Sequence, residues 1–379
     1  MSETIVFLGA GATKSCGGPL TSEILPGILA ASTTIDPAGS LNSIDRLQML
    51  REFLLEEFHV APKAPLELHP SLPLLMSLLD TAIEQRQHFH GRWDAQTISI
   101  LREEIEFGIF DLLEERLKTS PTNSHWDVIS AICGTSAEPS IISTNYDLIV
   151  DTAIMAFSRK RFPQGKFPNY GCEIGTDSYR SEDPHFGSLL KLHGSLNWLY
   201  CKTCQRLEIG ASENQKLNKY LPGPLNHSAT KEIGLRESFM PDGSPCPVCG
   251  TKLRPLLVAP TYFKNYRNPH LSQVWYQAEQ LLRSAKRAIF IGYSLPDDDV
   301  EVVYLLKRSL AHLSAPNITV VGHDEKLRGL SAHPTGQRYR ALFGDGIDWH
   351  PEGMDAWIAT QSALQRSLQP LNNLGQPCC

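Results

Sequence analysis

Several features that would define a class of protein are missing from these 379 residues. No apolar run approaches the roughly 20 residues that a helix needs to span a bilayer. An apolar run begins already at Thr4, so we expect no secretion signal. A net charge of −6, without a basic run interleaved with aromatic residues, argues against a dedicated nucleic-acid surface. The 41% hydrophobic and 20% charged residues are instead typical of a soluble globular enzyme.

Cysteine is sparse outside two short motifs. Cys201 and Cys204 form one C-x-x-C pair, and Cys246 and Cys249 form a second. These pairs predict a tetrahedral zinc site with four thiolates, although two unrelated cysteine pairs are the alternative. Four thiolates leave no open position on the metal, so such a zinc would be structural. Zinc thiolates together with scattered single cysteines suit a reducing cytoplasm, which is the location we expect.

Apolar, strand-like runs alternate with helical patterns at both ends of the chain. The runs are continuous, as in parallel strands that are buried on both faces. This alternation predicts an α/β fold with a Rossmann-like, doubly wound parallel sheet. The helical patterns that follow the strands lie near Leu20–Ala30, Tyr146–Ser158, Leu271–Ala285 and Val300–Leu313.

The alternation stops between about Ser40 and Lys118. Leu41–Phe58, Ser71–Gln87 and Thr97–Leu117 predict three amphipathic helices without strands between them. We interpret them as a helical insertion that serves either as structural cover or as a lid or assembly surface. The predicted domains are a Rossmann-like core in three parts (1–38, 121–200 and 252–379), the helical insertion (39–120) and a zinc ribbon (201–251).

Three polar motifs follow apolar runs, in the order Gly9–Thr13, Ser143–Asp147 and Lys191–Ser195. A glycine turn lets backbone N–H groups approach a pyrophosphate closely. Asn145 and His193, each at a strand end, can meet in the crevice where such a sheet binds ligands. Each motif also has a simpler explanation: a bare turn, a helix cap at Asn145, and a buried histidine at His193.

Two later strand ends extend this set. Gly292 and Ser294 follow the apolar run Ile289–Ile291 and precede three carboxylates, Asp297–Asp299. Asp298 and Asp299 can simply cap and charge the start of the next helix. Asp324 ends a further apolar run, and a carboxylate in that place suits the ribose hydroxyls of a nucleotide.

Together these motifs resemble the NAD site of the sirtuin (SIR2) family, in which a zinc ribbon also follows the His-Gly motif. The sequence Gly-Tyr-Ser-Leu-Pro at Gly292–Pro296 resembles the corresponding loop of the SIR2-like branch found in bacterial antiphage defence. The resemblance implies NAD as substrate, a structural zinc, and Asn145, His193 and Asp147 as catalytic residues. The NAD-binding residues that it implies are Gly9, Ala10, Gly11, Ala12, Thr13, Thr144, Gly292, Ser294 and Asp324.

The chain departs from sirtuin deacetylases around the peptide site. Gly17–Thr21 lacks the Phe and Arg of the deacetylase motif, and Thr144 replaces a Gln. Ala259–Lys264 stands where deacetylases carry the Phe-Gly-Glu that clamps the acetyl-lysine peptide, and its Pro removes a strand donor. We therefore expect an NAD+ glycohydrolase that releases nicotinamide and ADP-ribose. A protein-lysine deacylase and a non-catalytic NAD or ADP-ribose sensor are the alternatives.

The expected chemistry requires few groups. An Asn amide can position water or ribose hydroxyls, and a His can accept a proton from either. A constitutive NAD hydrolase would poison its own cell, so the activity implies a trigger. No sensor domain is evident in the sequence. A homo-oligomer or a partner protein, such as the HerA-type ATPase of similar defence systems, is therefore expected to supply the trigger.

Overall fold

The fold is described from a computed structural model of the chain. The structure describes residues 4–30, 43–61, 64–117, 123–133, 138–163, 165–176, 179, 185–209 and 245–368. The chain divides into two compact units. The first unit comprises Met1–Gly17, Thr119–Leu257 and Tyr266–Cys379, and the second comprises Gly18–Lys118 and Val258–Asn265.

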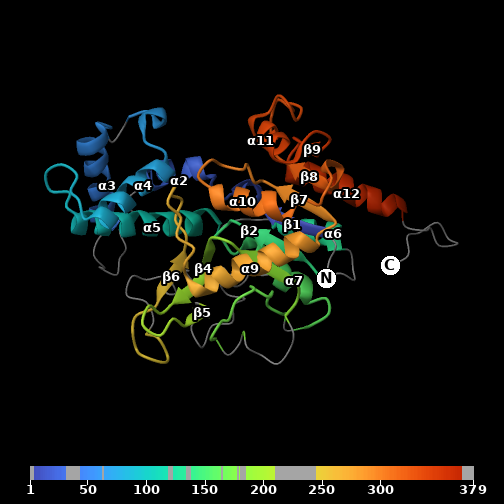
Figure 1. The fold of residues 1–379 in the computed structure, drawn as a ribbon, viewed down its shortest axis with the longest axis horizontal. Helices are drawn as coiled ribbons and strands as arrows, with labels where there is room; N and C mark the ends of the chain where they lie inside the picture. The colour runs from blue at the N-terminus through green and yellow to red at the C-terminus, as the bar shows by residue number, and fades with distance from the viewer. Residues whose placement is uncertain are drawn as a thin grey trace. The chain divides into compact units, whose positions relative to one another are not determined.

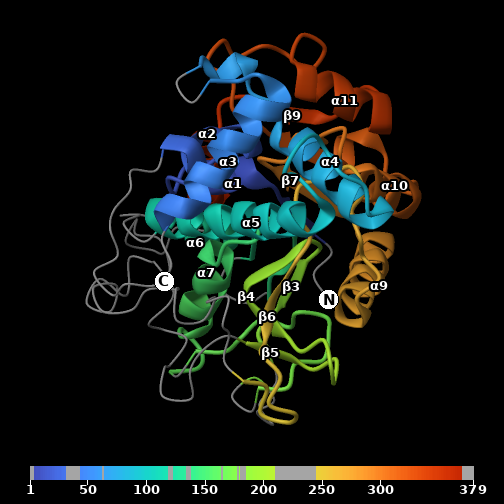
Figure 2. The same cartoon turned by 90° about the vertical axis from the view of Figure 1, so that its left-hand side faces the viewer.

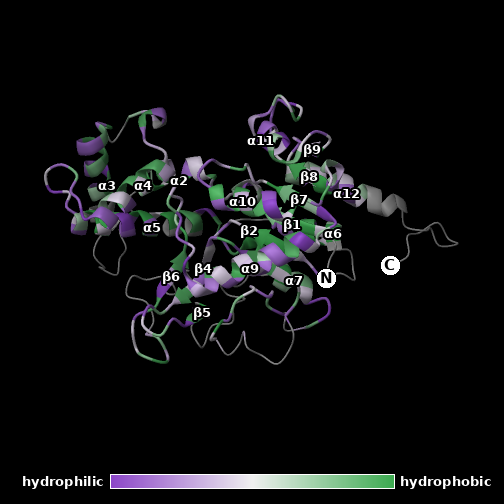
Figure 3. Ribbon diagram, in the orientation of Figure 1, coloured by the Kyte–Doolittle hydropathy of each residue, from purple (hydrophilic) through white to green (hydrophobic). Residues whose placement is uncertain are grey.

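A parallel sheet forms the centre of the first unit. Its strands are β1 (Thr4–Leu8), β2 (Ser140–Ser143), β3 (Ser188–Lys191), β7 (Arg287–Ile291), β8 (Ile318–Val321) and β9 (Asp348–His350). They lie in the order β3-β2-β1-β7-β8-β9, and every neighbouring pair is parallel. Figure 1 labels β2, β1, β7, β8 and β9, and Figure 2 labels β3. The inner strands are buried on both faces, and Figure 3 colours the interior of the sheet mainly as hydrophobic.

The strand order reverses at β1. From β1 the chain builds outward through β2 to β3 and then returns to build β7, β8 and β9 on the other side. In open α/β sheets, ligands bind beyond the carboxyl ends of the strands at such a reversal. The loops that follow β1, β2, β3 and β7 therefore occupy the expected position of a ligand site.

Helices cover the sheet. The helices of the first unit are α1 (Ala10–Lys14), α6 (Ser124–Cys133), α7 (Ile149–Ser158), α9 (Pro269–Ser284), α10 (Val300–Ser309), α11 (Pro334–Phe343) and α12 (Met354–Leu368). A short 3-10 turn, η3 (Ala315–Asn317), precedes β8. Figure 2 shows α6 and α7 on one side of the sheet and α9 and α10 on the other. The predicted doubly wound α/β fold is confirmed.

A small antiparallel sheet in the first unit carries the C-x-x-C motifs. Its strands are β4 (Gly194–Tyr200), β5 (Leu207–Ile209) and β6 (Arg254–Leu257), in the order β5-β4-β6. Gly194 opens β4 with a φ of 81°, and a Cβ atom there would lie 2.1 Å from the carbonyl oxygen of Leu256. The glycine of the His-Gly motif is therefore required by the close approach of β6.

The second unit is helical. It contains α2 (Thr21–Ala30), α3 (Ser43–Phe58), the 3-10 turn η1 (Leu66–Leu68), α4 (Leu72–Gln85) and α5 (Ala95–Leu117). The predicted apolar stripe of α5 is buried, from fully covered Leu101 to Leu113 at 7% exposure. The segment Val258–Asn265 belongs to this unit, where Thr261 and Tyr262 hydrogen-bond the hydroxyl of Ser77 in α4.

The predicted helices and strands are found to within a few residues, and the three helices of the insertion are α3, α4 and α5. No helix or strand is predicted after Asp324 from the sequence, whereas the structure has α11, β9 and α12 there. Helix α11 buries only Gly336 and Tyr339, so it carries little apolar periodicity to predict it. Within the described ranges, no helix is long and apolar enough to cross a membrane.

Candidate functional site

The glycine loop after β1 packs directly against the loop after β7. Gly9 donates its N–H to Ile291 (3.0 Å), and Gly11 donates to Gly292 (2.9 Å). Gly292 has a φ of 64°, and a Cβ atom there would lie 2.0 Å from the backbone nitrogen of Ala12. Gly9, Gly11 and Gly292 are thus needed for backbone-to-backbone contact, and the N–H groups of Gly9 and Gly11 are engaged inside the protein.

The Asn-x-Asp motif after β2 is joined to the glycine loop. The Nδ2 atom of Asn145 donates to the Gly9 carbonyl (3.0 Å) and to the Thr13 hydroxyl (2.9 Å). Thr13 in turn donates to Oδ2 of Asp147 (2.9 Å). All three side chains are at most 9% exposed. Both amide hydrogens of Asn145 are therefore used to fix the side chain, and its carbonyl oxygen takes no part in these bonds.

The simpler explanation of Asn145 as a helix cap does not fit this geometry. Helix α7 begins at Ile149, and the Oδ1 atom of Asp147 accepts the Ile149 N–H (3.0 Å). Asp147 therefore supports the helix start with one oxygen and holds Thr13 with the other. The hydroxyl of Thr13, one of the expected NAD-binding residues, is bonded to Asn145 and Asp147.

A buried lysine, Lys191, donates hydrogen bonds to the backbone of the Asn-x-Asp motif. The Nζ atom of Lys191, in β3, donates to the carbonyls of Asp147 (2.6 Å) and Tyr146 (3.3 Å). It also contacts Oδ2 of Asp151 (3.1 Å) and the Ser195 hydroxyl (2.7 Å). Both Lys191 and Asp151 have fully buried side chains. The cation thus ties β3, β4 and α7 to the backbone of the Asn-x-Asp motif.

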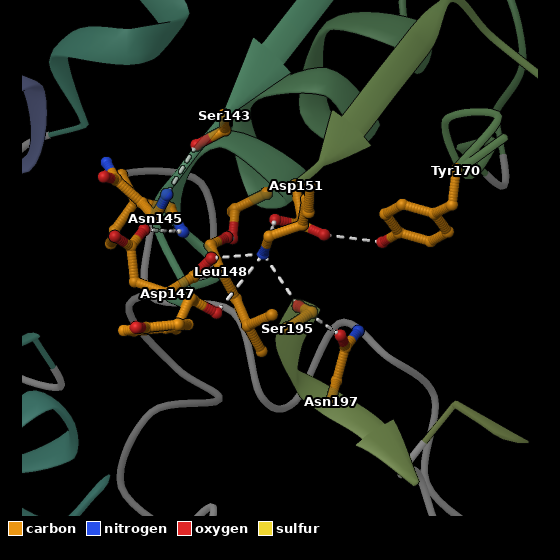
Figure 4. Close-up of polar contacts among 12 residues, drawn as sticks. Ser143, Asn145, Asp147, Leu148, Asp151, Tyr170, Ser195 and Asn197 are labelled. Carbon is orange, nitrogen blue, oxygen red and sulfur yellow. Dashed lines mark hydrogen bonds and ion pairs between the residues drawn. The ribbon is translucent and has the colours of Figure 1, made fainter. Parts of the chain in front are cut away.

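Two further hydrogen bonds extend this network to Tyr170 and Asn197. Tyr170 donates to Oδ1 of Asp151 (2.5 Å), and Ser195 donates to Asn197 (2.7 Å), as Figure 4 shows. Burial and the Asp151 charge raise the pKa of Tyr170 well above its ordinary value, so the phenol stays a hydrogen-bond donor. The sequence alone did not identify Lys191 and Asp151 as members of this network. The sequence did carry a signal for them: each is the one charged residue of an otherwise uncharged element, Lys191 in β3 and Asp151 in α7.

His193 follows β3 and is 5% exposed. Its Nε2 atom lies 3.7 Å from Oδ1 of Asp299, at the start of α10. The rings of Tyr146 and Tyr266 flank the imidazole at centroid distances of 6.2 and 6.1 Å. Asn145, His193 and the glycine loop therefore come from the carboxyl ends of three adjacent strands, as expected from the sequence.

Three other expected NAD-binding residues, Thr144, Ser294 and Asp324, each have a hydrogen-bond or ion-pair partner within the protein. Thr144 is buried and its N–H bonds the Leu8 carbonyl (3.0 Å). Ser294 is exposed, and its carbonyl accepts from Arg338 (2.8 Å). Asp324 pairs with the Arg328 guanidinium (2.8 Å), which holds the pKa of this carboxyl far below its usual range. Its carboxylate is thus already bonded, whereas a ribose-binding carboxylate would have to accept ribose hydroxyls.

The four motif cysteines form one cluster. All four Sγ atoms lie within 4.8 Å of one another, and two of the distances are 3.4 Å (Cys201–Cys249) and 3.5 Å (Cys204–Cys246). Tetrahedral zinc with Zn–S bonds of about 2.3 Å needs sulfurs about 3.8 Å apart. The two knuckles have the same backbone form, with Gln205 and Gly250 at positive φ after the second cysteine. The donor set therefore fits a four-thiolate metal site.

A further buried cysteine, Cys16, lies just after α1. The Sγ atom of Cys16 is 3.9 Å from Nδ1 of His125, and both side chains are buried. Burial raises the pKa of Cys16 and lowers the pKa of His125, so both shifts favour the neutral forms. Because a nucleophilic cysteine needs a thiolate, this pair is a packing contact rather than a catalytic dyad.

Comparison with known proteins gives similarity to solved structures only. No protein-family model matches the sequence, and no curated protein matches it. A Sir2 homologue in complex with NAD is 13% identical with a TM-score of 0.44, over 95% of this chain and 90% of that chain. A mutant Sir2 homologue in complex with ADP-ribose is 13% identical with a TM-score of 0.46, over 97% and 94%. A Sir2 complex with a p53 peptide and NAD+ is 12% identical with a TM-score of 0.38, over 96% of this chain and 92% of that chain. Scores this low carry no conclusion about activity, and the fold assignment rests on the strand order described above.

Proposed function

We propose that this chain is a SIR2-like NAD+ glycohydrolase that cleaves NAD+ into nicotinamide and ADP-ribose. One observation supports this most strongly. Asn145 is hydrogen-bonded to the glycine loop after β1, and His193 follows the neighbouring strand β3, at the carboxyl ends of parallel strands where ligands of such sheets bind. The three motifs that resemble the sirtuin NAD site thus follow the neighbouring strands β1, β2 and β3, which supports the proposal.

The side chains have separate tasks in this proposal. The glycosidic bond of NAD+ breaks through an oxocarbenium-like state, which leaves C1′ of the ribose open to water. The carbonyl oxygen of Asn145 accepts a hydrogen bond from that water or from a ribose hydroxyl, while Thr13 and Gly9 fix its amide. His193 accepts the proton that the water loses. Asp147 acts through Thr13 and is a positioning residue.

The four-cysteine cluster takes a structural zinc in this proposal. Cys201, Cys204, Cys246 and Cys249 would provide four thiolates, which fill a tetrahedral zinc completely. The metal would hold the two knuckles together and so fix β4, which begins directly after His193.

The segment Val258–Asn265 favours hydrolysis over protein deacylation. A peptide that binds by strand addition needs an extended edge with free backbone groups. This segment contains bends and no strand, and its Tyr262 N–H is bonded to the Ser77 hydroxyl (2.8 Å). A protein-lysine deacylase remains the alternative activity. A non-catalytic NAD sensor would not need both Asn145 and His193.

The biological setting follows from the chemistry. An enzyme that depletes NAD+ must be silent until it is triggered, which fits an effector of bacterial antiphage defence in the cytoplasm. Assembly into a homo-oligomer, or a partner such as a HerA-type ATPase, would supply the trigger.

The test compares NAD+ turnover by the full chain with that of Asn145→Ala and His193→Ala. Each variant should lose about 10²–10⁴ of the rate, since a positioned proton-transfer group contributes about this much. Asp147→Ala should be milder. Circular dichroism and zinc content show whether each variant is folded. Near-full turnover by folded His193→Ala would make His193 a buried structural histidine and remove the proposed site.

A further inference from the structure

A buried carboxylate faces the imidazole of His193. The Oδ1 atom of Asp299 lies 3.7 Å from Nε2 of His193, and each side chain is 6% exposed. At this separation the two groups form an ion pair only when the histidine is protonated. Water screens a buried pair much less than an exposed one, so the carboxylate acts strongly on the ring.

Asp299 is held in place by groups that do not belong to the helix start. Its Oδ2 atom accepts from the Tyr293 hydroxyl (2.9 Å), and Tyr339 donates to the Tyr293 carbonyl (3.0 Å). Burial and the Asp299 charge raise the pKa of Tyr293 well above its ordinary value, so this phenol remains a donor. Asp299 is the N-cap residue of α10, yet its side chain makes no capping bond there. Capping therefore does not explain the buried carboxylate.

The other groups described around the ring come from the segments before α7 and α9 and from the start of α10 itself. Tyr146 precedes α7, and Tyr266 precedes α9; both are phenols. Burial and the Asp299 charge raise the pKa of Tyr266, which keeps that phenol neutral. Asp298 and Glu301 are the additional carboxylates near Tyr266. Among these described groups, Asp299 is the carboxylate that lies within ion-pair distance of the His193 ring.

We propose that Asp299 is a positioning residue that orients His193 and stabilises its imidazolium form during NAD+ cleavage. This inference rests on the proposed function. In the step, the C1′–N bond breaks and its electron pair passes to the nicotinamide ring. A water oxygen bonds to C1′, and the water proton passes to His193, which later releases it to solvent. Asp299 keeps its charge throughout and compensates the imidazolium.

The Asp299 charge determines the direction in which the pH dependence of the cleavage rate should move. His193 must be neutral to accept a proton, so the rate rises with pH as the ring loses its proton. Removing the Asp299 charge makes the ring a weaker base. The acid limb of the pH–rate profile should then move to lower pH by about one unit, and the plateau rate should fall by about tenfold or more. The Michaelis constant should change less than the turnover number.

The test uses the full chain with Asp299→Asn and, as a matched control, Asp298→Asn one residue away. Two readouts are needed: the pH profile of NAD+ cleavage, and the pH midpoint of the His193 ring signals by NMR. Tyr293→Phe provides a gentler variant that keeps the charge and removes only its hydrogen bond, should Asp299→Asn fail to fold. We expect a lowered NMR midpoint and acid limb for Asp299→Asn, a smaller change for Tyr293→Phe, and little change for Asp298→Asn.

The two readouts separate the inference from the function on which it rests. If folded Asp299→Asn and Tyr293→Phe both keep the wild-type midpoint and profile, the Asp299 role is wrong. If the wild-type protein cleaves no NAD+, the proposed function fails, whereas the NMR midpoint still decides whether Asp299 acts on His193. An equal shift in Asp298→Asn would reduce the effect to general surface charge and also overturn the inference.

Discussion

Replacing Lys191 with methionine tests whether the buried cation holds the Asn-x-Asp loop. Methionine keeps most of the volume and removes a charge that contacts Asp147, Ser195, Asp151 and Tyr146 at 2.6, 2.7, 3.1 and 3.3 Å. The variant leaves Asp151 charged and fully buried, with Tyr170 as its remaining described side-chain partner. Breaking a buried pair in this way costs about 3–5 kcal/mol, which is a large share of a typical stability of about 5–15 kcal/mol.

The assay is urea unfolding followed by circular dichroism, with exposed Lys326→Met as the control. The double variant Lys191→Met with Asp151→Asn removes the orphaned charge while an amide oxygen can still accept from Tyr170. We expect it to recover part of the loss, with a coupling of about 0.5–3 kcal/mol. A single-variant cost under about 1 kcal/mol, or strictly additive effects, would refute the account of the buried pair.

Three further predictions concern the glycine loop, the metal and acid stability. Gly292→Ala should lower the thermal midpoint strongly, because its Cβ would lie 2.0 Å from the Ala12 nitrogen, whereas Gly329→Ala, in open space, should not. Cys246→Ser should lower both the zinc content and the free energy of unfolding, since a structural zinc site contributes to folding; metal-free wild-type protein that is fully stable would contradict this. Burial lowers the pKa of His125 from 6.5, so the unfolded chain takes up a proton that the folded chain resists. Stability should therefore fall as pH drops below about 6.5, and His125→Gln should flatten this dependence in urea unfolding measured across pH. An unchanged slope in His125→Gln would assign the acid sensitivity to other groups.

The location of the candidate site was predictable from chain order. Polar residues that follow buried parallel strands meet at one edge of a sheet, so Gly9, Asn145 and His193 could be placed together without coordinates. The cysteine cluster was predictable for a related reason, because each C-x-x-C knuckle brings its own two sulfurs to one metal. Both predictions rest on a general rule: the carboxyl ends of parallel strands share one edge of the sheet, and each C-x-x-C knuckle brings its two sulfurs together.

The contacts that fix the site were not predictable in the same way. Lys191 and Asp151 each stand alone in an apolar element, which signals a need for a partner but does not identify it. Asp297, Asp298 and Asp299 look alike in sequence, and only the start of α10 determines that Asp299 faces His193. Likewise, only tertiary packing shows that Asp324 binds Arg328.

Hydrolysis of NAD+ without a peptide distinguishes the proposed activity from protein deacylation. The most direct measurement follows the products by chromatography after the full chain is incubated with NAD+, with and without an acetylated peptide, and with Asn145→Ala as the blank. We expect nicotinamide and free ADP-ribose in equal amounts, whether or not peptide is present, and about 10²–10⁴ less of both from Asn145→Ala. Nicotinamide release that strictly requires the peptide and transfers its acetyl group to ADP-ribose, with no free ADP-ribose, would contradict it.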